Sequence, residues 1–235
     1  MTPQVLALAA ATSLAVSAHA SQFTIDLKIS RDGVVWQDSI SDFVVGDRVQ
    51  CAIFLNSDFS VPIYGVGGAT LRLNGSSSPI EDQVSFAPGT ATGRVSPFGF
   101  GAATNAIFRD TPGTFRIDAA SDVANNNTAA GLTFFQRDPS SGGASFSILP
   151  QGGIGSMVYR FEILLGSHDV YQTVLSMDQL TRGVVAYYSS SSATRPTQSS
   201  DVTLDGASFW VNVPTPGSLA MVGVGGFLVA RRRRL

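Results

Sequence analysis

The sequence predicts an all-β protein whose main part is a single antiparallel β-sandwich of Greek-key or jelly-roll type. Two observations support this fold class. Short segments in which apolar and polar residues alternate recur along the chain, separated by turns rich in Gly, Pro, Ser and Asn. Helical character is confined to the two ends, residues 1–20 and 214–235. The roughly 190 residues between them, 21–213, are enough for one domain with its own core.

The first predicted strand follows directly after residue 20. Its apolar residues alternate with polar ones, as in a half-buried strand: Phe23, Ile25, Leu27 and Ile29. Asp32-Gly33 is a two-residue hairpin signal, so we expect the chain to turn there and return as a strand over residues 34–36.

A second alternating segment predicts a strand that carries the only cysteine of the chain. Residues 44–47 form the expected turn, and one face of the strand then carries Val49, Cys51, Ile53 and Leu55. A lone cysteine cannot form an intrachain disulfide, so stability has to come from burial. We therefore expect the thiol of Cys51 to lie in the core.

The remaining predicted strands become stronger towards the C-terminus. They cover residues 69–73, 84–86, 106–109, 114–118, 132–136, 145–149, 157–165, 171–177, 184–188 and 207–213. The Gly-, Ser- and Asn-rich region 89–143 predicts long loops or marginal edge strands rather than a second domain. Residues 189–200 are expected to form one exposed loop between two late strands.

Residues 1–20 predict a secretory signal peptide. An apolar stretch from Val5 to Val16 precedes Ala18-His19-Ala20, which has the small-x-small pattern of a cleavage site before Ser21. We therefore expect export through Sec-type machinery.

The last residues combine three parts in a fixed order. A short motif, Pro214-Thr215-Pro216-Gly217-Ser218, precedes an apolar segment over 219–230 and a block of four arginines, Arg231, Arg232, Arg233 and Arg234. The arginines favour the cytoplasmic side of a membrane. A helix from Pro216 to Ala230 would be roughly 22 Å long, which is short for a hydrocarbon core of about 30 Å. This predicts transient membrane insertion over 216–230, with a plain C-terminal anchor as the alternative.

This three-part segment resembles the PEP-CTERM sorting signal of Gram-negative bacteria, which is recognised by an exosortase, a membrane protease. The usual Pro-Glu-Pro core reads Pro214-Thr215-Pro216 here, so the acidic residue is missing. The resemblance implies cleavage near the motif by an exosortase-type protease. The protein would then be held in the inner membrane before it reaches the cell envelope, the surface or the exterior, in association with exopolysaccharide.

The charge of the mature chain argues against nucleic acid as a partner. Without the terminal arginine block, 11 Lys and Arg remain against 17 Asp and Glu, a net charge of about −6. Phosphate contacts require clustered Lys and Arg, which an acidic domain does not offer.

Few residues of the sandwich suggest catalysis, and we assign no catalytic residue, cofactor or metal. His168 is the only histidine after residue 20, and it falls in a predicted turn. Glu81, Asp82 and Glu162 are the candidates for a carboxylate pair of the glycosidase type, but no spacing singles out two of them. Glu162 lies on the outward face of its strand, where solvation explains it equally well.

Two kinds of ligand nevertheless deserve a residue-by-residue check. Calcium takes oxygen ligands, which two sets of aspartates could supply: Asp32, Asp38 and Asp42, or Asp201 and Asp205. Sugars stack on exposed aromatic rings, for which the candidates are Trp36, Trp210, Tyr187 and Tyr188. Trp210 alternates with Phe209 and Val211, so its ring faces either solvent or the second layer.

The strand pattern of residues 23–73 is similar to cohesin-like and carbohydrate-binding sandwich modules, with no functional residue in common. Two hypotheses follow for the protein as a whole. The first is an exported, non-catalytic surface or matrix protein, and the second is a carbohydrate-binding module that uses Trp36 and Trp210.

Overall fold

The computed structural model describes residues 23–58, 63–90, 93–96, 98, 105–109, 113–119, 132–134, 154–179, 185–190 and 192–212. These residues form strands, turns and bends, so the all-β prediction is confirmed for them. None of them forms a helix with the length and apolarity needed to span a bilayer. The predicted signal peptide, the sorting segment and the strand at 145–149 lie outside the described residues.

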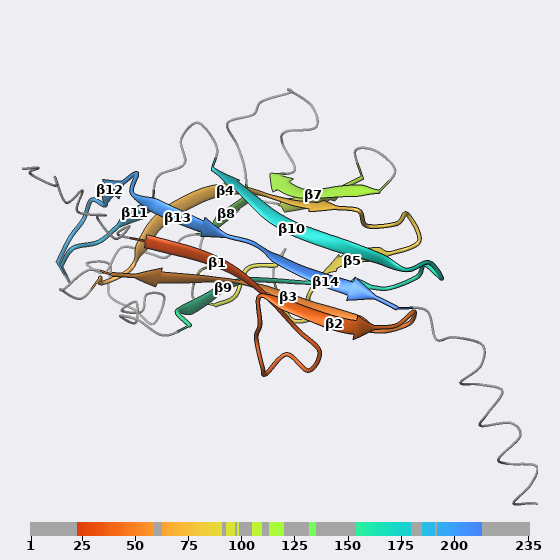
Figure 1. Ribbon diagram of the computed structural model, residues 1–235. Coiled ribbons are helices and arrows are strands. Elements are labelled where there is room, and N and C mark those ends of the chain that lie inside the picture. The colour runs from red at the N-terminus through yellow and green to blue at the C-terminus, as the bar shows by residue number, and fades with distance from the viewer. Residues whose placement is uncertain are drawn as a thin grey trace, which may run out of the picture.

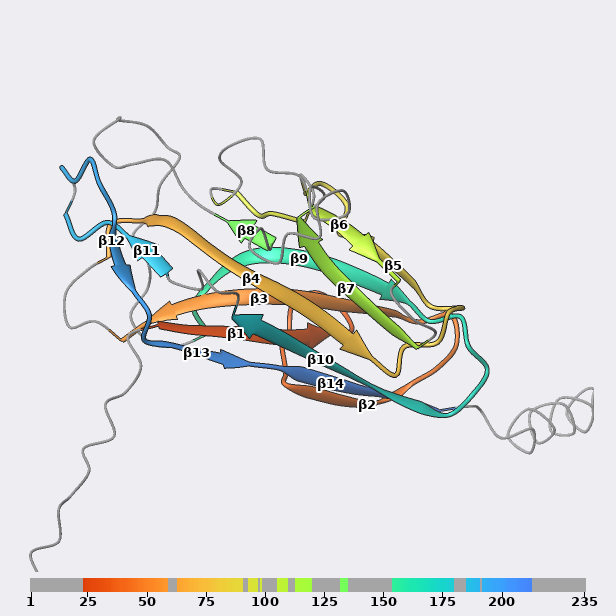
Figure 2. The same ribbon diagram turned by 90° about the horizontal axis from the view of Figure 1, so that it is seen from above.

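The strands form two layers (Figures 1 and 2). Sheet A has the order β13-β1-β3-β9-β5, and its strands are β1 (Phe23–Ser30), β3 (Arg48–Ser57), β5 (Gln83–Phe86), β9 (Ser156–Leu164) and β13 (Val202–Asp205). Sheet B has the order β12-β11-β4-β10-β14-β2, with β7 and β8 paired to β4 and β6 paired to β7. Its strands are β2 (Ser39–Phe43), β4 (Val66–Ser76), β6 (Asn105–Phe108), β7 (Thr114–Ala119), β8 (Leu132–Phe134), β10 (Tyr171–Gln179), β11 (Val185–Tyr187), β12 (Thr197–Ser199) and β14 (Ala207–Val211).

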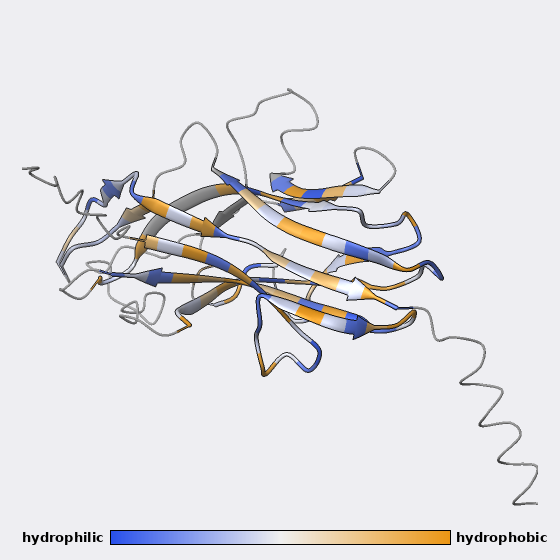
Figure 3. Cartoon of the chain, viewed as in Figure 1, coloured by the Kyte–Doolittle hydropathy of each residue, from blue (hydrophilic) through white to orange (hydrophobic). Residues whose placement is uncertain are grey.

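One apolar core lies between the sheets, and the period-2 patterns point into it. In β3 the side chains of Val49, Cys51, Ile53 and Leu55 are all inaccessible to solvent, as predicted. The sheets meet through pairs such as Phe115 of β7 and Phe161 of β9, whose ring centroids are 6.4 Å apart. Alternating apolar and polar bands along the strands are visible in Figure 3.

The prediction of an entirely antiparallel sandwich is wrong at two pairs. β13 pairs in parallel with β1, and β14 pairs in parallel with β2. β13 and β14 are consecutive, so the last part of the chain crosses from sheet A into sheet B. A Cβ atom at Gly206, between them, would lie 2.4 Å from the carbonyl oxygen of Leu175. Parallel pairing needs a long connection, and the rest of the chain supplies it.

The predicted return strand at 34–36 is also wrong. Residues 31–35 form bends in a loop that projects from the sandwich between β1 and β2 (Figure 1). Gln37 forms an isolated antiparallel bridge with Ile29, and the next strand, β2, begins at Ser39. β2 has no period-2 pattern because its register against β14 shifts and Asp42 has a φ of 72°.

Residues 189–200 are not one exposed loop, in contrast to the prediction. β12 lies within them and pairs with β11, from Val185 opposite Ser199 to Tyr187 opposite Thr197. Its sequence, Thr-Gln-Ser, has no apolar residue, so only its partner strand identifies it as a strand.

Candidate functional site

The projecting loop owes its shape to the side chain of Asp32. Oδ1 of Asp32 accepts hydrogen bonds from the backbone amides of Val34 and Val35, at 2.8 and 3.0 Å, and from the hydroxyl of Ser30 at 2.9 Å. Gly33 takes a φ of 73°, which glycine adopts without strain. The carboxylate thus organises a loop where Asp32-Gly33 predicted a two-residue turn.

Trp36 lies against the outer face of sheet A. Its ring meets Phe54 of β3 edge-on at 5.5 Å, and the guanidinium of Arg160 lies 6.0 Å from its centroid. Phe54 is consequently almost fully buried although it points away from the core. Trp36 is therefore a covering residue of sheet A, and its ring is not free for a sugar.

Because the loop depends on an ionised carboxylate, we expect it to respond to acid. The backbone amides of Val35 and Val34, and then the hydroxyl of Ser30, lower the pKa of Asp32 to about 2. A lowered pKa stabilises the folded form above the unfolded value of about 3.9, and this contribution is lost as the pH falls towards 2. In a Trp210→Phe variant, in which Trp36 is the only tryptophan, its emission should shift to longer wavelength across that range.

Two substitutions complete this test. Asp32→Ala should show the shifted emission already at neutral pH, whereas Asp32→Asn keeps an acceptor oxygen and should remove the pH dependence. An acid transition that is the same in wild type and Asp32→Asn would contradict the role of this carboxylate.

Trp210 faces solvent on the outer side of sheet B. It has 45% of its side chain exposed, while its neighbours Phe209 and Val211 point into the core. Gln172 of β10 lies directly across from it. The two predicted aromatic candidates therefore differ, and only Trp210 offers an accessible ring. The other two are engaged inside, because Tyr188 is buried and Tyr187 packs on Phe23 at 5.4 Å.

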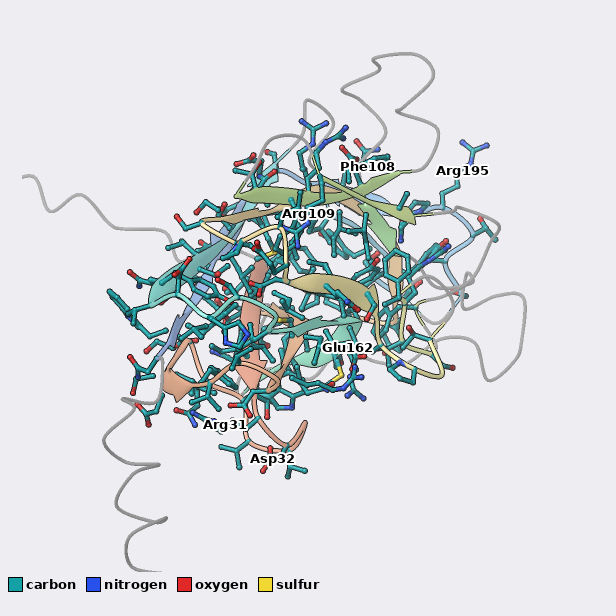
Figure 4. All side chains as sticks on the ribbon, turned by 90° about the vertical axis from the view of Figure 1, so that its right-hand side faces the viewer. Arg31, Asp32, Phe108, Arg109, Glu162 and Arg195 are labelled. Atoms are coloured by element: carbon teal, nitrogen blue, oxygen red, sulfur yellow. The ribbon has the colours of Figure 1, made fainter. Side chains whose placement is uncertain are left out.

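Glu162 lies on the outer face of sheet A, as predicted, but it is buried rather than solvated. Arg48 forms an ion pair with it, and Gln50 and Ser85 donate hydrogen bonds at 3.2 and 3.4 Å. Figure 4 views the sandwich end-on, with Glu162 in the lower layer and Arg109 above it. All these partners come from strands of sheet A, so Glu162 holds that face together.

Asp82 is buried between the two layers at the end of the sandwich. The hydroxyl of Tyr171 donates to its two carboxylate oxygens at 2.8 and 2.7 Å, and the amide of Gly166 donates at 2.9 Å. Desolvation, and then the hydrogen bond and charge of Asp82, raise the pKa of Tyr171. Arg109 donates to the backbone oxygen of Asp82. Asp82 and Glu162 thus have separate sets of partners, and their hydrogen bonds do not join them into one acid pair.

The other reactive side chains are placed as the sequence suggests. Cys51 is fully buried, and burial, followed by the charge of Glu162, raises the pKa of its thiol well above the usual value. His168 is exposed in the loop between β9 and β10.

The aspartates considered for calcium are also engaged by protein groups. Lys28, on β1, contacts Asp38 at 2.5 Å and Asp26 at 2.6 Å, so an ammonium group lies where a cation would be expected. Within the described residues, no group of three or more His, Cys, Asp and Glu side chains could hold a metal ion. The predicted cleavage residues Ala18 and Ala20, the motif Pro214–Ser218 and the block Arg231–Arg234 lie outside the described residues.

No family model and no curated protein matches the sequence. Among solved structures, the chain is similar to the seventh ScaB type I cohesin of Pseudobacteroides cellulosolvens, with 14% identity over 83% of this chain and 94% of that one and a TM-score of 0.43. It is also similar to the sixth cohesin of Acetivibrio cellulolyticus scaffoldin B, solved with a dockerin (12% identity, 83% and 100% coverage, TM-score 0.40). A third is a non-cellulosomal cohesin of Archaeoglobus fulgidus (10% identity, 86% and 98% coverage, TM-score 0.36). Cohesins were one of the two module types that the early strand pattern resembles, but TM-scores of this size assign no family or partner to the chain.

Proposed function

We propose that the protein is an exported, non-catalytic module of the cell envelope or its extracellular matrix, delivered through its C-terminal sorting segment. The observation that carries this proposal is the position of that segment. β14 ends at Val211, and the motif begins at Pro214, so the sorting segment follows the last strand almost directly. The sandwich is closed by its own contacts, while the tail bears the features of an address.

The chemistry of the described residues supports a non-catalytic role. The carboxylates that a hydrolase would use, Asp82 and Glu162, are held by hydrogen bonds and an ion pair within the fold. The thiol of Cys51 is buried and kept protonated, whereas a nucleophilic cysteine needs an exposed, electropositive setting. Binding or a structural role is the activity that remains for such a surface.

The proposal is tested by the location and intact mass of the protein isolated from its own cells. We expect a mature N-terminus at Ser21 and a new C-terminus close to Pro214-Thr215-Pro216, with the protein in the envelope or the medium. Recovery of peptides that continue intact through residues 224–230 would show that the tail is a plain membrane anchor.

A second candidate role, polysaccharide binding by the released module, is favoured by the exposed ring of Trp210 beside Gln172. Indole faces stack on sugar rings, and an amide side chain donates to and accepts from sugar hydroxyls. We expect Trp210→Ala to abolish binding to the producer's exopolysaccharide in an affinity gel. Gln172→Ala should weaken it, whereas Trp36→Phe, which keeps an aromatic ring against Phe54, should leave it unchanged. Equal retardation of wild type and Trp210→Ala would exclude this site.

A further inference from the structure

The end of the sandwich from which the chain leaves is formed by three loops and the end of β14. The loops are residues 44–47, 77–82 and 165–170, and both Figure 1 and Figure 2 show these connections at the same end as the last residues of β14. The amide of Gly46 donates to the carbonyl of Leu165 at 2.8 Å, and that of Asn212 donates to Phe43 at 2.7 Å. We call this region the exit end.

Large apolar side chains are exposed at the exit end. Ile80 is 69% exposed, Val170 is 63% exposed, and Trp210 is 45% exposed. Tyr171, which follows Val170, pairs with Val211, so Val170 lies beside the point where the chain leaves. Trp210 is one residue before Val211. We call these three residues the exit patch.

The exit patch is held in place by the buried Asp82. The hydrogen bonds of Asp82 to Tyr171 and Gly166 tie the loop that carries Ile80 to the loop that carries Val170. These side chains are therefore presented by a bonded pair of loops, although their own burial contributes nothing to the core.

The number of residues between β14 and the tail restricts what the exit patch can meet. Four residues separate Asn212 from Pro216, where the predicted membrane segment begins, and four extended residues span at most about 14 Å. The headgroup layer on one side of a bilayer is about 5–8 Å thick. While the tail is inserted, the exit end therefore lies within a few ångströms of the headgroups.

We propose that the exit patch rests on the lipid surface while the tail is in the membrane, with Ile80 and Val170 in the headgroup layer and Trp210 at its edge. Tryptophan suits this position because its ring is apolar and its N–H bonds to polar groups of the interface. Glu81 and Asp169, exposed on the same loops, fit zwitterionic lipid better than an anionic surface. This inference rests on the membrane insertion of the tail that is part of the proposed function.

The buried Cys51 allows a direct test with site-specific thiol probes. Ile80→Cys, Val170→Cys and the control Val34→Cys each add one exposed thiol, and Val34 is on the projecting loop, away from the exit end. The full chain carrying an environment-sensitive fluorophore is reconstituted in phosphatidylcholine vesicles with nitroxide-labelled lipid. We expect blue-shifted emission and several-fold stronger quenching at positions 80 and 170 than at 34. Quenching at 80 and 170 should decrease when half of the lipid is phosphatidylglycerol.

The outcomes separate this inference from the proposal on which it depends. A chain that does not float with the vesicles would overturn tail insertion and the lipid contact together. A chain that floats, with water-like emission at positions 34, 80 and 170 alike, would overturn the lipid contact alone. In a Trp36→Phe background, a shift of Trp210 emission with soluble exopolysaccharide but not with vesicles would assign the ring to carbohydrate instead.

Discussion

Replacement of Arg231, Arg232, Arg233 and Arg234 by serine is expected to abolish processing of the protein. An arginine at the centre of a bilayer costs about 2.5–3.5 kcal/mol on insertion scales, so four of them oppose passage of the tail by about 10 kcal/mol. Without them the short, glycine-containing apolar segment has nothing to hold it, and Pro214-Thr215-Pro216 would not be presented at the membrane surface. The measurement is the C-terminus of the product, by intact mass.

Replacement of the same four residues by lysine provides the matched control. Lysine keeps the positive charge, so this variant should be cut as the wild type is. Normal cleavage of the serine variant would show that the arginine block does not stop the tail, and the proposed sorting route would then be wrong.

Asp82→Ala is expected to lower the free energy of unfolding by about 3 kcal/mol, because it leaves buried donors without partners. The hydroxyl of Tyr171 and the amide of Gly166 both lose their acceptor, and the loop 77–82 loses its connection to β10. A loss of this size is a large share of the 5–15 kcal/mol that stabilises a typical domain. Urea unfolding followed by circular dichroism measures it.

The neighbouring Glu81 makes this test specific. Glu81 is exposed, so Glu81→Ala should change stability by no more than about 0.5 kcal/mol. Tyr171→Phe removes one donor together with its hydrogen bonds and should fall between the two. Equal stability of Asp82→Ala and Glu81→Ala would mean that the hydrogen bonds of Asp82 do not hold the exit end together.

Much of the sandwich could be predicted because period-2 alternation is a local signal. Phe23 to Ile29 and Val49 to Leu55 point inward as their patterns indicate, and the long β9 and β10 lie where their apolar faces predict them. β2 and β12 could not be predicted, since one contains a register shift and the other has no apolar residue. Both are strands only because a neighbouring strand pairs with them.

The candidate surfaces divide in the same way. Alternation around Trp210 left two directions open, and the packing of Phe209 and Val211 into the core decides for solvent. No local pattern shows that Trp36 covers Phe54, because that contact depends on how Asp32 shapes the loop. The cluster around Asp82 is also invisible in the sequence, where 89 residues separate it from Tyr171.

The sequence by itself determined the all-β class, the inward face of each main strand and the order of the three parts of the tail. These follow from side-chain periodicity and composition, which act over a few residues. Tertiary structure alone decided which strands run in parallel, which tryptophan remains accessible and which carboxylates are buried. Those outcomes depend on contacts between residues distant in the chain, where the free energy of burial and hydrogen bonding selects among arrangements that the local sequence allows equally.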